Sequence, residues 1–244
     1  MKWELEQLED AVRNAHGDLH ADAIHEPLQS LIWKSEMAYY HACAAEELLK
    51  DAVAEVEGIT EDDPPSVAAG KAVLIAAAPG EAGQELRFAK FKAEAHVIAS
   101  AQALHSLCDI MCHVVYWACK LDTAPNPPAT NRLNLHSVVR TLNLLPQYST
   151  TAALIQEVVD SPEFRYLVGY VNTTKHNSLV KSTMSAAFDE DRGGIRIKAF
   201  TYTDPRGNVH NFDQKWAHDF VLPENQAVRL KLLAVGHSLN GHFV

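Results

Sequence analysis

The sequence is poor in cysteine and in the short motifs that mark many enzymes. Its 244 residues include four cysteines, and Cys108, Cys112 and Cys119 fall within one apolar helical stretch. Cys108 and Cys112 lie one helical turn apart, which is a poor geometry for a disulfide. We find no phosphate-binding glycine loop, no G-x-S-x-G elbow and no zinc-type cysteine pairing. The thiols therefore indicate a reducing compartment, and the common motif-bearing enzyme classes are not indicated.

The chain also lacks the marks of disorder and of secretion. Charged residues make up 21%, too few for a disordered chain, and the net charge of -10 opposes non-specific attraction to phosphate backbones or anionic membranes. The first residues, MKWELEQLEDAV, have no apolar core of a signal peptide. Residues 95–119 are long enough to span a bilayer, but Asp109 near their middle would be costly in lipid. We therefore expect a cytoplasmic protein without a membrane segment.

Hydrophobic residues make up 47% of the chain, which is ample for a core, and most of them recur at helical spacing. We interpret Pro27, Pro162 and Pro223 as the first residues of three helices, and Ser161 as the N-terminal cap of the helix that begins at Pro162. The spacing predicts helices over residues 2–16, 27–57, 66–78, 81–121, 135–143, 152–159, 162–181 and from 223 onward.

The period changes between residues 184 and 212, where apolar and polar residues alternate. Ile195 and Ile197 alternate with Arg196 and Lys198, which predicts two short strands around the turn at 191–194, with a third strand at 209–212. The predicted fold class is mainly α: a helical bundle with a small antiparallel β hairpin or sheet insertion near residues 184–212 and a C-terminal helix. We expect one domain over residues 1–244.

Three polar residues recur at steps of four along the apolar stretch. His105, Asp109 and His113 lie on one side of a helix, and imidazole and carboxylate suit Zn, Fe or Mn. One ion cannot reach both histidines, since they are about 12 Å apart along a straight helix. A metal would bind one pair and further ligands from elsewhere. The structural alternative is that Asp109 is a buried carboxylate held by a neighbouring histidine.

A second polar cluster ends the helix predicted over 162–181. Asn172, Lys175 and His176 are three and four residues apart and therefore neighbours on a helix. Histidine serves as a general acid or base near neutral pH, and lysine and asparagine bind phosphate or orient a hydroxyl. The structural alternative is a solvated last turn whose cations complement the helix dipole.

The long helices and the sequence VNTTKH near the end of a bundle helix resemble the HEPN superfamily over about residues 27–182. That resemblance implies a helical bundle of prokaryotic toxin–antitoxin or defence type, often a homodimer, and often a metal-independent ribonuclease. The family motif is Arg, a polar residue, and His four to six residues beyond the Arg. Asn172 matches the polar position and His176 the histidine, whereas Val171 stands at the Arg position. Because valine supplies no cation for phosphate, the resemblance favours a binding or regulatory member.

The predicted strands carry a local basic patch in an otherwise acidic chain. Arg192, Arg196 and Lys198, with Phe200 and Tyr202 nearby, are of the types that contact phosphates and stack on bases. The structural alternative is a solvated hairpin face.

Taken together, the sequence predicts a HEPN-like binding or regulatory protein that contacts RNA or nucleotide through Asn172, Lys175 and His176, without a cofactor. If the chain is an enzyme, the activity that we expect first is that of a metal-independent ribonuclease. The second hypothesis is a metal-dependent hydrolase or oxidase that uses Asp109 with His105 or His113. A protein-interaction scaffold without a small ligand is the third hypothesis, and a homodimer is expected.

Overall fold

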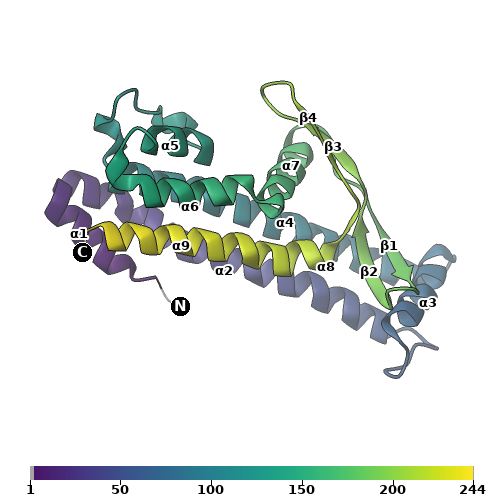
Figure 1. Ribbon diagram of the computed structural model, residues 1–244. Coiled ribbons are helices and arrows are strands. Elements are labelled where there is room, and N and C mark those ends of the chain that lie inside the picture. The colour runs from purple at the N-terminus through teal and green to yellow at the C-terminus, as the bar shows by residue number, and fades with distance from the viewer. Residues whose placement is uncertain (1–2, 244) are drawn as a thin grey trace. The chain divides into compact units, whose positions relative to one another are not determined.

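The computed structural model describes residues 3–243 and is mainly helical, with short antiparallel strands and a long last helix (Figure 1). This confirms the predicted fold class. The helices are α1 Leu5–His16, α2 Asp18–Ala54, α3 Pro65–Ala77, α4 Glu81–Ala118, α5 Leu135–Leu142, α6 Ser149–Asp160, α7 Pro162–His176, α8 Ala217–Asp219 and α9 Asn225–Phe243. The strands are β1 Ser182–Ala187, β2 Arg192–Ile197, β3 Phe200–Thr203, β4 Val209–Phe212 and β5 Lys215–Trp216.

The chain divides into two compact units, each assembled from separate segments. Unit 1 comprises Met1–Glu36, Ala103–Arg165 and Gln226–Val244, and unit 2 comprises Met37–Gln102 and Tyr166–Asn225. The expectation of a single domain over residues 1–244 stays a prediction.

Unit 1 is an all-helical core that joins the first and last helices. Leu8 and Val12 of α1 and Ile24 and Leu28 of α2 are almost fully buried, as their helical spacing requires. Trp3 Nε1 donates to Asn240 Oδ1 of α9 at 2.8 Å. Thr151 of α6 and Ser238 of α9 are joined by a hydroxyl–hydroxyl bond of 2.8 Å.

Unit 2 places the strands against α3 and α7. The strand order is β1-β2-β5 in one antiparallel sheet, and β3 pairs with β4 in another. Helix α3 lies close to β1 and β2 (Figure 1), because Gly193 offers no side chain where a Cβ would be 2.1 Å from that of Ala69. Asp191, in the β1–β2 turn, accepts bonds from the amide and hydroxyl of Ser66 at 3.2 and 2.7 Å. Asp191 therefore pairs one of the backbone amides in the first turn of α3 that have no partner within the helix.

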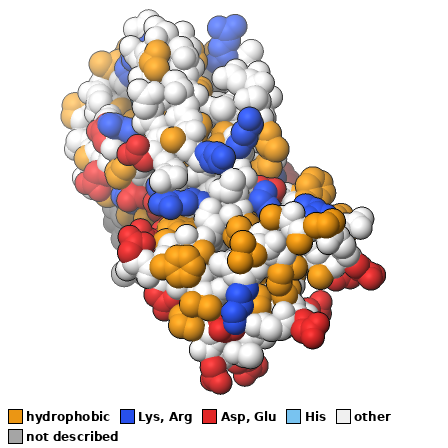
Figure 2. Space-filling view, turned by 90° about the vertical axis from the view of Figure 1, so that its right-hand side faces the viewer, with side chains coloured by type: hydrophobic (Ala, Val, Ile, Leu, Met, Phe, Trp, Pro, Cys, Tyr) orange, Lys and Arg blue, Asp and Glu red, His pale blue; other side chains and the backbone are white. Residues whose placement is uncertain are grey.

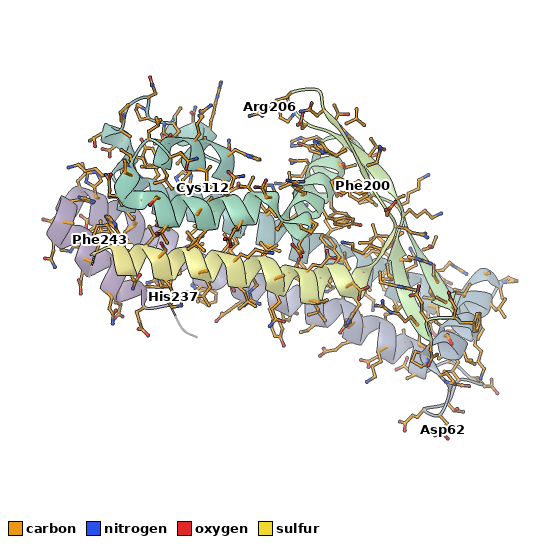
Figure 3. The ribbon with its side chains drawn as sticks, in the orientation of Figure 1. Asp62, Cys112, Phe200, Arg206, His237 and Phe243 are labelled. Atoms are coloured by element: carbon orange, nitrogen blue, oxygen red, sulfur yellow. The ribbon has the colours of Figure 1, made fainter. Side chains whose placement is uncertain are left out.

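An aromatic cluster attaches the β3–β4 hairpin to α7. Phe200 of β3 and Phe212 of β4 contact the ring of Tyr166 at centroid distances of 5.3 and 5.4 Å. Phe200 also contacts Tyr170, and Figure 3 shows Phe200 on the strand beside α7, with Arg206 at the far tip of the hairpin. This cluster fixes one face of α7, which positions the residues at its C-terminal end.

Four boundaries differ from the sequence predictions. Pro27 lies inside α2 and does not begin a helix, because Ile24 and Leu28 are buried on both sides of it and outweigh one lost backbone bond. Helix α7 ends at His176 and not near 181, since the amides of Asn177 and Ser178 both donate to Thr173 O. Pro223 lies within a π-helical turn, Phe220–Glu224. The fourth difference lies in the strands, because neither β3 nor β5 was predicted as a separate strand.

Within the described part of the chain, α4 alone is long and apolar enough to cross a membrane by length and composition, and 56% of its most apolar window is buried in the protein. The absence of a membrane segment stays a prediction.

Candidate functional site

The C-terminal end of α7 presents two unpaired polar side chains to solvent. Tyr166, Leu167 and Tyr170 are buried, whereas Lys175 and His176 are exposed and make no hydrogen bond or ion pair with any residue among 3–243. The predicted cap is confirmed at the other end, where Ser161 Oγ accepts from the amide of Phe164 at 3.3 Å. The helix therefore carries Lys175 and His176 at its last turn, where the helix dipole favours positive charge.

Asn172 has a structural contact that the sequence did not predict. Its side chain hydrogen-bonds the hydroxyl of Tyr202 on β3. Burial raises the pKa of Tyr202, the charge of Asp204 adds to that shift, and the bond from Asn172 opposes it. Asn172 thus holds β3 against α7, while His176, one turn further on, is exposed.

The chain leaving α7 brings two lysines together across the first strand pair. The amide of Lys198 donates to Lys181 O at 2.9 Å, which continues the β1–β2 register in which Ser182 is opposite Ile197. Lys181 and Lys198 are therefore directly opposite, exposed, and without a carboxylate partner among residues 3–243. Like charges directly opposite on paired strands are destabilising. The geometry of this pair makes it a candidate anion site.

The two lysines belong to the lining of a cavity of about 260 Å³ that lies wholly within unit 2. Buried apolar walls come from α4, α7 and β2. Figure 2 views the molecule from the right-hand side of Figure 1 and shows Lys and Arg side chains among apolar ones on that face. The lining consists of Glu94, Val97, Ile98, Tyr170, Leu179, Val180, Lys181, Ser182, Ile195, Ile197 and Lys198.

Glu94 is the cavity's carboxylate, and its charge is already compensated. Lys90 donates to Glu94 Oε1 at 2.5 Å, and the hydroxyl of Ser182 donates to the same oxygen. Burial raises the pKa of Tyr170, and the nearby charge of Glu94 raises it further, so this hydroxyl stays neutral. With Glu94 and Lys90 cancelling, Lys181 and Lys198 leave the cavity with an excess of positive charge.

The two arginines of the predicted basic patch are engaged within the protein. Arg192 makes two bonds to the carboxylate of Asp219, at 2.9 and 2.6 Å. The guanidinium groups of Arg192 and Arg196 lie 5.4 and 5.1 Å from the ring of Trp216. Alternation along β2 leaves Ile195 and Ile197 buried, as predicted. Of the three predicted ligand-binding residues, only Lys198 lines the cavity.

The predicted metal ligands do not converge. Nδ1 of His105 lies 3.3 Å from Asp109 Oδ2, close enough for charge attraction, but that nitrogen lacks a partner with hydrogen-bond geometry. Over residues 3–243, no three His, Cys, Asp or Glu side chains are grouped so that they could hold one ion. The structural alternative is wrong in its burial, because the side chain of Asp109 is 53% exposed and lies beside His105 on the surface of α4.

Lys181 and the cavity were not predicted from the sequence. The signal was present, because the hairpin that pairs Ala187 with Arg192 also brings Lys181 opposite Lys198 when its register is extended. The cavity itself needs α4 beside that hairpin, which no local pattern specifies.

No protein-family model, curated protein or solved structure matches the chain. What the site binds is therefore inferred from its own residues.

Proposed function

We propose that this protein is a binding module for phosphate-bearing ligands, RNA or nucleotide, and that unit 2 carries the site. The observation behind the proposal is the cross-strand pair of Lys181 and Lys198, which has no carboxylate partner in the described part of the chain. An anion between two such lysines replaces a repulsion by two charge-assisted bonds. Lys175 and His176, six and five residues before Lys181, add further donors near the same connection.

The resemblance of VNTTKH to the HEPN superfamily supports RNA as the ligand and a homodimer as the assembly. Val171, at the position of the family's arginine, is 1% exposed. A buried valine gives no phosphate contact, so we propose binding without efficient cleavage. Exposed Tyr40, Phe88 and Phe91 on α2 and α4 offer apolar area for a second copy.

The test is the affinity for a labelled single-stranded RNA, measured by fluorescence anisotropy. We expect the double variant Lys181→Ala/Lys198→Ala to weaken binding about tenfold or more, since two phosphate contacts are lost. Lys50→Ala removes an exposed lysine of α2 elsewhere in unit 2 and is the matched control. Equal loss in both variants, or none in either, contradicts the proposal.

A degradation assay with the same RNA separates binding from catalysis. We expect intact RNA with and without EDTA. Cleavage that survives EDTA and is lost in His176→Ala would make the protein a metal-independent ribonuclease. Cleavage abolished by EDTA would point to metal chemistry instead.

A further inference from the structure

The cavity in unit 2 combines apolar walls with a cationic edge. Val97, Tyr170 and Ile197 are among its buried lining residues, while Lys181 and Lys198 are exposed. Apolar cavities of about 150 Å³ accept a benzene ring, and drug-sized ligands occupy about 300–1,000 Å³. A cavity of about 260 Å³ lies between these sizes, so it suits one or two rings.

The charge at the cavity selects the kind of ligand. Glu94 bonds to Lys90 and Ser182, so its charge is met within the protein. Lys181 and Lys198 have no such partner among residues 3–243. A neutral apolar ligand would leave their repulsion in place, and a free inorganic anion would leave the apolar walls uncovered.

We propose that the cavity binds the ring of a small amphipathic anion whose charged group lies between Lys181 and Lys198. The proposal rests on the proposed function in so far as both use these lysines, but it adds the apolar walls as a second determinant. Two sources share this chemistry: a nucleotide unit, with base and phosphate, and a free aromatic phosphate or carboxylate. The ring gains from leaving water, and the anion gains from the lysines.

The experiment is isothermal titration calorimetry of the full chain with phenyl phosphate, inorganic phosphate and phenol. We expect phenyl phosphate to bind about tenfold or more tightly than either part alone, because ring and charge are both recognised. Ile98→Trp fills the cavity from a half-buried position of α4 and should remove that advantage while leaving inorganic phosphate unchanged. Leu74→Trp, at a position 74% exposed on α3, is the control.

Phenyl phosphate that binds no better than inorganic phosphate, or that binds Ile98→Trp as well as wild type, overturns the proposal. The lysine variant separates the two claims: RNA binding that is lost there but intact in Ile98→Trp retains the proposed function and shows that RNA does not use the cavity, while the phenyl phosphate titrations decide the cavity itself. If Ile98→Trp fails to fold, nuclear Overhauser effects from the phenyl protons to the methyl groups of Ile98 and Val180 decide instead, and their absence rejects the cavity. Displacement by adenosine monophosphate identifies the nucleotide source, and displacement by phenylacetate alone identifies the free anion; either supports the cavity.

Discussion

At the scale of single residues, the pair His41 and His96 is a contact in unit 2 that depends on pH. Their Nδ1 atoms lie 2.8 Å apart, so one ring donates and the other must accept as a neutral imidazole. Burial lowers the pKa of His41, and the charge of His96 lowers it further. A histidine pKa that is lower in the folded than in the unfolded state gives stability that is present above about pH 6.5 and lost as pH falls below it.

We therefore expect the melting temperature to fall between about pH 7.5 and about pH 5.5, and to fall less in His41→Gln than in wild type. His25→Gln is the control of opposite sign. Its bond to Glu9 raises the pKa of His25, so this residue stabilises at low pH and its removal should steepen the loss. Parallel pH profiles for His41→Gln and wild type would contradict the expected role.

The cysteines give a second prediction at this scale. Three cysteines, Cys108, Cys112 and Cys119, are buried, and burial raises the pKa of each thiol. These thiols therefore stay protonated and inaccessible to reagents in solvent. Cys43 is half-buried. Titration with a thiol reagent should label Cys43 first in the native protein and all four cysteines in denaturant. The variant Cys43→Ser should show no fast phase of thiol labelling in the native protein. Rapid labelling of Cys112 in the native protein would contradict the burial of that side chain.

At the scale of elements, Gly169 lets the β3–β4 hairpin lie against α7. A Cβ there would be 2.3 Å from Phe212 Cε2, and Phe212 cannot easily withdraw because Tyr166 and Phe200 contact its ring. Alanine gains about 1 kcal/mol of helix propensity, but overpacking costs about 1–3 kcal/mol. Gly169→Ala should therefore be destabilised in urea unfolding. Gly241→Ala should not be destabilised, because no atom lies within 4 Å of the added Cβ. Equal stability of both variants would show that the β3–β4 hairpin shifts to make room for the Cβ at residue 169.

Elements with a strong period could be predicted from the sequence, and their partners could not. The helical spacing over residues 81–121 and the alternation of Ile195 and Ile197 with Arg196 and Lys198 both identify a buried face, since the hydrophobic period reports which side chains share a face. The period does not say what covers that face. The bond that the amide of Ser66 donates to Asp191 joins residues 125 positions apart, and the cavity needs α4, α7 and β2 together. For the same reason Lys175 and His176 could be proposed from the sequence, whereas Lys181 required the strand register.

At the scale of the whole molecule, a net charge of -10 repels the phosphates of RNA, so any RNA binding depends on a local basic surface. For single-stranded RNA, a plot of the logarithm of the binding constant against the logarithm of the salt concentration falls with a slope of about 0.7 per phosphate contact. Loss of Lys181 and Lys198 should therefore reduce the steepness of this plot by about 1.4. Affinity measured from about 50 to about 200 mM salt tests this. Lys50→Ala should keep the wild-type slope, and an unchanged slope in the lysine double variant would place the phosphates elsewhere.

The division into interleaved segments has a consequence for the order of events during synthesis. Unit 2 has all its segments once residue 225 has been added, while the first helices of unit 1 still wait for Gln226–Val244. Until α9 emerges from the ribosome, Trp3 and Thr151 lack their partners Asn240 and Ser238. Residues 3–36 of unit 1 are therefore made before unit 2 and gain their α9 partners after it, so a nascent chain that has not yet reached α9 exposes apolar surface and needs protection from aggregation.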